Sequence, residues 1–207
     1  MAKLNRDLIV ETALALVDDA GIEKLSFRQL AGALDCSAML VYRYFDSKQM
    51  LLEAVADRAW MRIEFDRGAR FASWQVALRE CLLYVRQILL ANPNVVVLLG
   101  TQSAFGPGGF GVIENFLSIL TRHGFVLDCR GFDLVNGLFQ SLIGHVLAEH
   151  DQNRDSSDYQ SLALGDYPHI MQVLQEWSYD GQRQLIALIE AAVKGYENAR
   201  GHGDEKQ

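Results

Sequence analysis

The feature that most constrains the fold is the segment 22–52, where signals for the beginning and end of short helices follow one another closely. Ser26 is followed three positions later by Gln29, which is the spacing of a capping box. In a capping box each side chain binds the free backbone N–H of the other residue. The pattern therefore predicts that a helix begins at about Phe27.

This first short helix should end near Leu34, because the next residue, Asp35, is polar and short enough to adopt the left-handed backbone that often ends a helix. Ser37 is then expected to cap a second helix. At about 100° per residue, Val41 and Phe45 of that helix point inward. Two short helices around a tight turn form a helix-turn-helix, a motif that places its second helix in a groove of DNA.

The outward face of the second helix is unusually apolar for a helix in water. Met39 points directly away from the core, and Leu40, Tyr42 and Tyr44 flank it. Apolar side chains of this kind can contact base edges, such as the methyl group of thymine. The alternative is a plain helical hairpin whose Tyr42 and Tyr44 pack against a neighbouring domain.

The surroundings of the motif resemble a known protein family. Across residues 8–56 the order is a helix, Gly21, Leu-Ser-x-Arg-x-Leu-Ala, a turn, Tyr-Arg-Tyr-Phe-x-Ser-Lys and Leu-Leu. This order resembles the tetracycline repressor (TetR) family of bacterial transcriptional regulators. The chain departs from the family pattern at Asp35, where glycine is usual, and at Leu40, where threonine is frequent. The resemblance implies an all-α protein that binds double-stranded operator DNA as a homodimer and is not an enzyme.

The resemblance also implies which side chains contact DNA. Bases would be read by Arg28, Ala38, Met39, Leu40 and Tyr44. Phosphates would be held by, or lie near, Ser26, Ser37, Tyr42, Arg43 and Lys48. The chemistry is suitable, because an arginine can bind guanine through two parallel hydrogen bonds.

Net charge does not by itself indicate DNA binding. The chain has 19 basic and 26 acidic residues, a net charge of -7. Residues 1–48 hold six basic and seven acidic side chains, so this segment carries -1 and the remainder carries -6. An acidic remainder suppresses non-specific DNA binding and leaves affinity to a few salt-sensitive phosphate contacts. We therefore expect a selective binder that works only as a dimer.

The sequence also indicates in which cellular compartment the protein works. No apolar run is long enough to span a membrane, and the first residues lack the apolar core of a secretion signal. Cys36, Cys81 and Cys129 are odd in number and widely spaced, which indicates neither a disulfide framework nor a zinc site. The expected location is the bacterial cytoplasm.

Helical patterns continue along the chain, so the expected fold class is all-α. Further helices are predicted over residues 47–65, 73–92, 110–123, 128–150 and 181–198. One more helix is predicted to begin at Asp166 and Pro168. Residues 1–48 would be the DNA-binding domain, 49–199 a helical ligand-binding and dimerisation domain, and 200–207 a disordered tail. The helix over 47–65 belongs to both domains, so displacement of its far end would move the DNA-binding domain.

Residues 105–111 contain glycines with the GxGxxG spacing of a dinucleotide-binding loop. Such a loop follows a strand and needs an acidic residue on a later strand, and the sequence shows neither. We therefore interpret the segment as a flexible connection between helices, placed to act as a lid over a pocket.

The two long late helices, 128–150 and 181–198, are apolar over much of their circumference. Small residues on one helix face allow a second helix to approach closely. In the family, the corresponding helices pair with their mates in a four-helix bundle, which implies an interface at Gly137, Gly144, Leu185, Leu188 and Ala192. The alternative is that these residues belong to the core of a single chain.

The C-terminal part resembles the ligand domain of the tetracycline-repressor type, through Leu-Gly-Thr at 99–101 and His-Gly-Phe at 123–125. The resemblance implies a ligand site at Glu64, Cys81, Val85, Leu98, Thr101, Phe105, Phe116 and Leu138, with Gln140 as a further polar group. Leu98 and Phe116 stand where that type uses polar side chains to hold a magnesium-bound drug. Because magnesium prefers oxygen ligands, we expect an apolar pocket with no metal and no cofactor.

Simpler interpretations of several of these residues stay open. Glu64 is equally explained as a solvated helix residue, and Phe116 as a core residue. His145 and Glu149 are four positions apart, which indicates an ordinary helix pair rather than a metal site.

Together these inferences predict a repressor that binds a palindromic operator as a homodimer and is released by a small, largely apolar effector. One alternative is a DNA-binding regulator that senses no molecule. The other is a helical enzyme or carrier that uses its first three helices only for packing.

Overall fold

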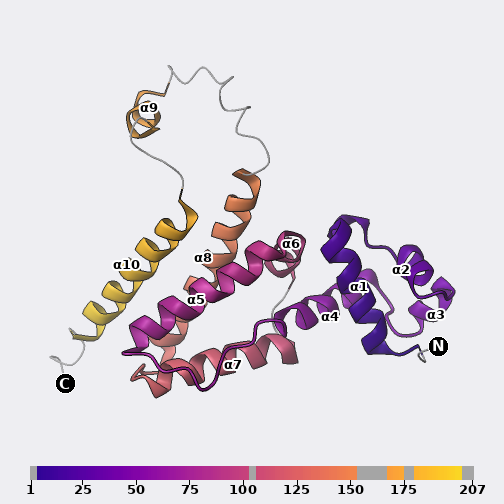
Figure 1. Cartoon of the computed structure of the whole chain (residues 1–207), viewed down its shortest axis with the longest axis horizontal. Helices are drawn as coiled ribbons and strands as arrows, with labels where there is room; N and C mark the ends of the chain where they lie inside the picture. Colours follow the sequence, from indigo (N-terminus) through magenta and orange to yellow (C-terminus); the bar gives the residue numbers. More distant parts are fainter. Residues whose placement is uncertain (1–3, 103–105, 153–166, 175–179, 202–207) are drawn as a thin grey trace.

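The structure is a computed structural model that describes residues 4–102, 106–152, 167–174 and 180–201. Within these ranges all regular secondary structure is helical, as expected (Figure 1). The elements are α1 (Arg6–Ala20), the short 3-10 helix η1 (Ile22–Lys24), α2 (Phe27–Ala33), α3 (Ala38–Tyr42), α4 (Lys48–Trp60), α5 (Trp74–Ala91), α6 (Pro93–Thr101), α7 (Pro107–Arg122), α8 (Cys129–Gln152), α9 (Pro168–Leu174) and α10 (Gly181–Gly201). Phe105, Asp166, residues 153–158 of the polar segment before α9, and the tail from residue 202 lie outside the described residues.

Helices α1 to α3 form a cluster at one end of the molecule (Figure 1). Half of the predicted capping box is present, since the Ser26 hydroxyl accepts from the backbone N–H of Gln29 at 3.2 Å. The Gln29 side chain accepts from the Ser26 hydroxyl at 3.1 Å instead of from the Ser26 backbone N–H, so the reciprocal half of the prediction was wrong. Asp35 has a φ of 49°, which confirms the left-handed turn. The prediction for Ser37 was wrong in one respect: it stands at the N-cap position of α3, but its side chain makes no capping hydrogen bond.

Helix α4 runs from the N-terminal cluster into the rest of the molecule (Figure 1) and contacts α1, α6 and α7. Ser47 caps it by accepting from the backbone N–H of Met50 at 3.2 Å. The helix ends at Trp60, so the predicted end near Phe65 was wrong. After Trp60 the backbone makes tight turns, and Phe65 is buried in the core although it is no longer helical.

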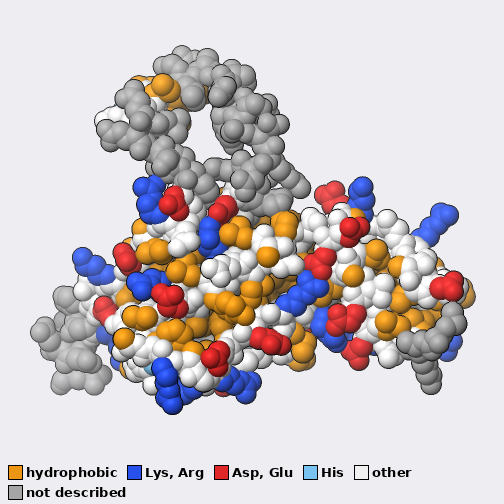
Figure 2. Space-filling model, viewed as in Figure 1, with side chains coloured by type: hydrophobic (Ala, Val, Ile, Leu, Met, Phe, Trp, Pro, Cys, Tyr) orange, Lys and Arg blue, Asp and Glu red, His pale blue; other side chains and the backbone are white. Residues whose placement is uncertain are grey.

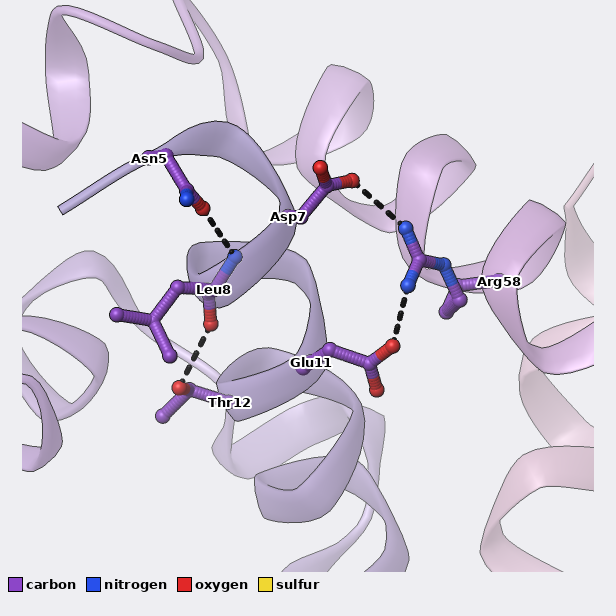
Figure 3. Close-up of polar contacts among 6 residues, drawn as sticks. All are labelled: Asn5, Asp7, Leu8, Glu11, Thr12 and Arg58. Atoms are coloured by element: carbon purple, nitrogen blue, oxygen red, sulfur yellow. Dashed lines mark hydrogen bonds and ion pairs between the residues drawn. The ribbon is translucent and has the colours of Figure 1, made fainter. Parts of the chain in front are cut away.

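Two arginines of the α4 segment bind the acidic side of α1. Arg58 donates to Asp7 at 2.8 Å and also to Glu11, as Figure 3 shows. Arg62, two residues after the end of α4, pairs with Asp18 at 2.6 Å. These contacts neutralise three acidic residues of the N-terminal segment on the side of α1 that faces α4, so the acidic count of residues 1–48 overstates the charge near α3.

The larger part of the molecule is built from α5, α6, α7, α8 and α10. Its buried apolar side chains form one core that continues into the N-terminal cluster, because buried residues of α4 pack on both sides. Helix α7 begins at Pro107 rather than at residue 110, so the prediction of a flexible connection was wrong for Gly108 and Gly109, which are helical. Proline is well suited to the first turn of a helix, where its missing N–H is not needed.

Helices α8 and α10 pack along each other, and α5 packs against both. Arg86 of α5 is buried and binds both carboxylate oxygens of Glu149 in α8, at 2.5 and 2.7 Å. Gly181, at the start of α10, lies so close that an added Cβ would be 2.5 Å from the Glu149 carboxylate. This ion pair therefore lies where three helices meet.

Among the described residues, no single helix has the length and apolar character needed to cross a membrane. The pair α5 and α6, bent by 113° between them, meets the requirement by length and composition only.

Candidate DNA-binding surface and ligand cavity

The outer face of α3 is apolar and exposed, as its sequence predicted. Met39 has 78% of its surface exposed and Tyr42 has 51%, whereas Val41 and Phe45 are fully buried. Leu40 and Tyr44 are exposed to a smaller extent, at 38% and 36%. The described part of the chain does not cover this face, so it is available to a partner such as a DNA groove.

Contacts with the N-terminal residues fix the orientation of α3 and of the turn after it. The Tyr44 hydroxyl donates to the backbone carbonyl of Leu4 at 3.0 Å. Arg6 donates to the backbone carbonyl of Tyr44 at 3.1 Å, and its guanidinium lies 4.2 Å from the centre of the Phe45 ring. These contacts join positions about 40 residues apart, which is why the local helix signals did not predict them.

Helix α2 supports the same face through aromatic packing. The Tyr42 ring lies 4.3 Å from the Phe27 ring, which limits the positions that the Tyr42 hydroxyl can take. Ser26, Arg28, Ser37, Arg43 and Lys48 are exposed, whereas Ala38 is half-buried. The side-chain ammonium of Lys48, the first residue of α4, donates to the backbone carbonyl of Ile22 at 3.5 Å, which holds this side chain beside η1. The structure thus brings all ten predicted DNA-contacting residues into the α2, α3 and early α4 region.

Charge is distributed in a way that agrees with selective rather than general attraction. Figure 2 shows acidic and basic side chains interspersed over the visible face rather than gathered by sign. Within the described residues, Arg28 and Arg43 take part in no ion pair, while three of the four acidic residues of α1 are paired with arginines of the α4 segment. Free cations beside an exposed apolar face are the arrangement that binds phosphates and base edges together.

A cavity of about 460 Å³ lies between α4, α6, α7 and α8, and we call it the α4–α8 cavity. The lining residues that matter here are Trp60, Gly109, Phe132, Asn136, Phe139 and Gln140. Each of the lining residues is uncharged, and most are apolar. Trp60 is the last residue of α4, so one wall of the cavity belongs to the helix that carries the N-terminal cluster.

A smaller hollow of about 250 Å³, the Cys81 hollow, lies between the segment after α4 and helices α5 and α7. Glu64 and Cys81, both predicted to contact ligand, line it. Burial, helped by the negative charge of Glu80, raises the pKa of the Cys81 thiol from 9.0 to about 11. Phe116 is fully buried, and its ring lies 5.5 Å from the ring of Phe65, which lines the Cys81 hollow, and 5.1 Å from the ring of Phe139, which lines the α4–α8 cavity.

The other predicted ligand residues lie elsewhere. Val85, Leu98, Phe116 and Leu138 are buried in the core and do not line the α4–α8 cavity, whereas Gln140 does. Thr101 is exposed, and its hydroxyl donates to the backbone carbonyl of Val97 at 2.8 Å. A contact between ligand and these core residues therefore requires rearrangement, and their roles stay predictions. The sequence missed Trp60 and Asn136 because their importance depends on how α4 meets α8.

The predicted dimer residues divide between surface and core. Gly137 and Gly144 are exposed on α8, and an added Cβ would have no neighbour within 4 Å. Leu188 and Ala192 are half-buried on α10. Leu185, in contrast, is fully buried within its own chain, so it does not extend a free side chain to a partner.

The glycine-rich segment does not form a phosphate site in this structure. The backbone N–H groups of Gly108 and Gly109 donate to the Asp57 carboxylate, at 2.7 and 3.0 Å. Among the described residues, no cluster of histidine, cysteine, aspartate and glutamate has the arrangement of a metal site. His145 binds the backbone carbonyl of Ser141 and Glu149 binds Arg86, so the predicted pairing of His145 with Glu149 was wrong.

Helices α1 to α3 form a unit whose α3 has an exposed outer face, and α4 joins this unit to an uncharged cavity. This arrangement is typical of a helix-turn-helix DNA-binding regulator. Residues 9–55 match the family model described as bacterial regulatory proteins, tetR family. This segment is therefore similar to the DNA-binding part of that family, and the relatives of the chain described below are transcriptional regulators.

Whole-length relatives support this assignment. The chain is 27% identical over 201 residues to the class D tetracycline repressor protein of Escherichia coli, covering 95% of this chain and 91% of that protein. It is 28% identical over 215 residues to an HTH-type transcriptional regulator of Saccharopolyspora erythraea, covering 94% and 87% of the two chains.

Solved structures show the same fold. The structure of a possible TetR family transcriptional regulator from Streptomyces coelicolor A3(2) has a TM-score of 0.78 and 25% identity, covering 94% of this chain and all of that one. The ActR protein of Streptomyces coelicolor, in complex with actinorhodin, has a TM-score of 0.80 and 22% identity, covering 97% of this chain and all of that one. At that identity, the second likeness concerns the fold alone.

Proposed function

We propose that the protein binds a palindromic operator as a homodimer and leaves it when a small, largely apolar molecule occupies the α4–α8 cavity. The observation that carries the proposal is the position of Trp60, which is both the last residue of α4 and part of the cavity wall. A molecule in this cavity therefore contacts the helix whose first residue, Lys48, lies in the DNA-binding region.

The DNA-contacting residues in this proposal are those predicted from the sequence. Arg28 would bind guanine, Met39 and Leu40 would contact apolar base features, and Lys48 would bind a phosphate beside a helix N-terminus. Their support is that they share one exposed region around α3. The Tyr44 hydroxyl already donates to the backbone of Leu4, so we expect Tyr44 to contact DNA through its ring.

The homodimer would form through the exposed face of α8 together with α10. Gly137 and Gly144 leave room there for the backbone of a second helix to approach. Two copies related by a two-fold axis would present two α3 helices to successive turns of a palindrome. Gly144→Arg should therefore convert a dimer to a monomer in light scattering, while the equally exposed Gly111→Arg should leave the mass of the complex unchanged.

Release of DNA would require the ligand to favour one conformation over another. A ligand that bound both conformations equally would change no equilibrium, however tightly it bound. The α4–α8 cavity fits this requirement, because its walls come from four helices, and a movement of α4 relative to α8 would change its shape. Gly109 of α7 lines the cavity and also binds Asp57 of α4, which provides a second connection between cavity and α4.

The deciding experiment is a band-shift assay with the DNA upstream of the gene, repeated with apolar compounds that raise the melting temperature of the protein. The proposal expects a sequence-selective complex that those compounds dissociate. A complex that no stabilising compound weakens would favour a regulator that senses no molecule. Bacterial regulators of this family act on DNA, so we propose that the protein works in the bacterial cytoplasm.

A further inference from the structure

The lining of the α4–α8 cavity indicates what kind of molecule it takes. We propose that the ligand is a neutral aromatic ketone or a related carbonyl compound, held with its oxygen toward Trp60 and α8. This inference rests on the proposed function only in naming the cavity as the effector site. The binding preference can be measured without DNA.

The first argument concerns charge. Within the described residues, the cavity lining includes no lysine, arginine, histidine, aspartate or glutamate. Transferring an ion from water into such a space is costly unless an opposite charge compensates it. A neutral molecule loses far less on entry, so the cavity selects against carboxylates, sulfonates and amines.

The second argument concerns shape and surface. Trp60, Phe132 and Phe139 contribute rings from two sides of the cavity, α4 and α8. Aromatic side chains bind other aromatic rings through offset or edge-to-face contact, which adds to the burial of apolar area. The rest of the wall comes mainly from aliphatic residues and glycine, including Gly109. A flat ring system of two or three fused rings matches such a lining.

The third argument concerns hydrogen bonds. Asn136 and Gln140 are one helical turn apart on α8, and among the described residues neither side-chain amide makes a hydrogen bond. Each amide offers both donors and an acceptor. Gln102 is different: its oxygen accepts from Gln49 at 2.8 Å and its nitrogen lies 3.4 Å from the Thr101 hydroxyl. The amides available to a ligand are therefore those of α8.

Trp60 supplies an independent indication. Its ring N–H is buried and has no acceptor in the structure, although a buried donor of this kind usually has one. The ring itself forms part of the cavity wall. If the ring moved on ligand binding so that this N–H faced the cavity, a carbonyl oxygen there would supply the missing acceptor and link ligand binding to the end of α4.

Three probes of nearly the same shape test the proposal: 9-fluorenone, fluorene and fluorene-9-carboxylate. Their dissociation constants would be measured by isothermal titration calorimetry on the full-length protein without DNA. We expect fluorenone to bind most tightly, fluorene about 10-fold more weakly, and the carboxylate at least 100-fold more weakly. Binding of the carboxylate as tight as that of fluorenone, or no binding of fluorenone up to 1 mM (about −4 kcal/mol at the limit), would overturn the proposal.

Variants locate the site and separate the contributions. Gln140→Leu should weaken fluorenone about 10-fold and leave fluorene nearly unchanged, because only fluorenone has an oxygen. Gln87→Leu, which changes an exposed amide on α5 away from the cavity, is the matched control and should change neither. Equal effects of both variants, or equal weakening of both probes by Gln140→Leu, would contradict the assignment.

The same measurements distinguish this inference from the proposed function. If fluorenone binds as described but does not dissociate the protein from its operator, the ligand class stands and the effector role of the cavity is wrong. If a charged compound dissociates the DNA complex while fluorenone does not bind, the repressor function stands and the ligand class is wrong.

Discussion

The carboxylate of Asp57 in α4 accepts a hydrogen bond from the backbone N–H of Gly108 in α7, at 2.7 Å. Asp57 therefore caps the beginning of a helix that lies 50 positions later in the chain, where first-turn N–H groups have no partner within the helix itself. The close approach depends on glycine, because a Cβ at Gly108 would lie 2.3 Å from the backbone carbonyl of Asp57. The two helices consequently meet backbone to backbone.

Replacing Gly108 tests this contact. Gly108→Ala should destabilise the protein by about 1–3 kcal/mol, because the new methyl group collides with backbone rather than with a flexible side chain. Gly111→Ala is the matched control, since it lies in the same helix with open space around its Cβ, and it should stabilise by about 0.5–1 kcal/mol. Urea denaturation measures both. Similar free energies of unfolding for the two variants would show that α4 and α7 are not in tight contact.

Removing the carboxylate tests the cap itself. Asp57→Ala should lower the free energy of unfolding by about 0.5–2 kcal/mol, the usual loss for a helix cap. Asp57→Asn keeps an oxygen that can accept the same bonds and should lose less. If the contact also carries the response to ligand, Asp57→Ala should bind operator but need more effector for release. Unchanged stability in both variants would remove Asp57 from this role.

The Arg86–Glu149 pair should be sensitive to the loss of one partner. Both side chains are largely buried, so Glu149→Ala leaves an unpaired guanidinium in the core and should cost about 3–5 kcal/mol. Replacing both residues, as in Arg86→Met with Glu149→Leu, should restore most of that loss because no charge remains unpaired. Thermal unfolding of the two variants provides the comparison, and a double variant less stable than the single one would refute it.

The cysteines should react with thiol reagents at very different rates. Burial raises the pKa of Cys81 to about 11, so at pH 8 almost none of it is thiolate, while Cys129 is exposed. In a Cys36→Ser background, which removes the half-buried third cysteine, titration with Ellman's reagent at pH 8 should therefore give a fast phase that Cys129→Ser abolishes. The thiol of Cys81 loses its proton near pH 9.0 in the unfolded chain and near pH 11 in the folded protein. The contribution of Cys81 to stability is therefore complete below pH 9.0 and declines as the pH rises from 9.0 to about 11. A fast phase that persists in Cys129→Ser would contradict the assignment.

The proposed contact between Arg28 and a base is tested with Arg28→Ala. Loss of an arginine that contacts guanine should weaken operator binding by about 1–3 kcal/mol and relax the preference at one base position. Arg79→Ala, an exposed arginine of α5 paired with Glu80, keeps the same change in net charge and should alter affinity little. Fluorescence anisotropy with labelled operator measures both, and equal losses would indicate a general charge effect.

Local signals predicted much of the fold. The Ser26 cap is present, Ser47 and Ser73 cap the helices predicted to begin at those positions, and Asp35 has the predicted left-handed backbone. These succeeded because each depends on side chains within three or four positions of the helix terminus. The predicted inward and outward residues also agree with the structure: periodicity fixes Met39, Leu40 and Val41 within α3, whereas Tyr44 and Phe45 lie just after the helix, which ends at Tyr42.

Features that depend on distant contacts were predicted less well. The beginning of α7 was placed too late, because its first turn is held by Asp57 rather than by a residue next to it. The ligand residues inferred from the resemblance lie partly in the core, where Phe116 fills space that a different side chain would leave open. Trp60 and Asn136 had no recognisable local signal, since only the packing of α4 against α8 brings them to one cavity.

The short length of α4 sets the sensitivity of the proposed switch. Its 13 residues, at 1.5 Å each, form a rod of about 20 Å that begins at Lys48 and ends at Trp60. Tilting such a rod by about 5° displaces its far end by nearly 2 Å, which is more than the tolerance of a hydrogen bond to a base edge. A molecule that shifts the indole of Trp60 only slightly would thus disturb the fit of the protein to its operator, without unfolding any helix.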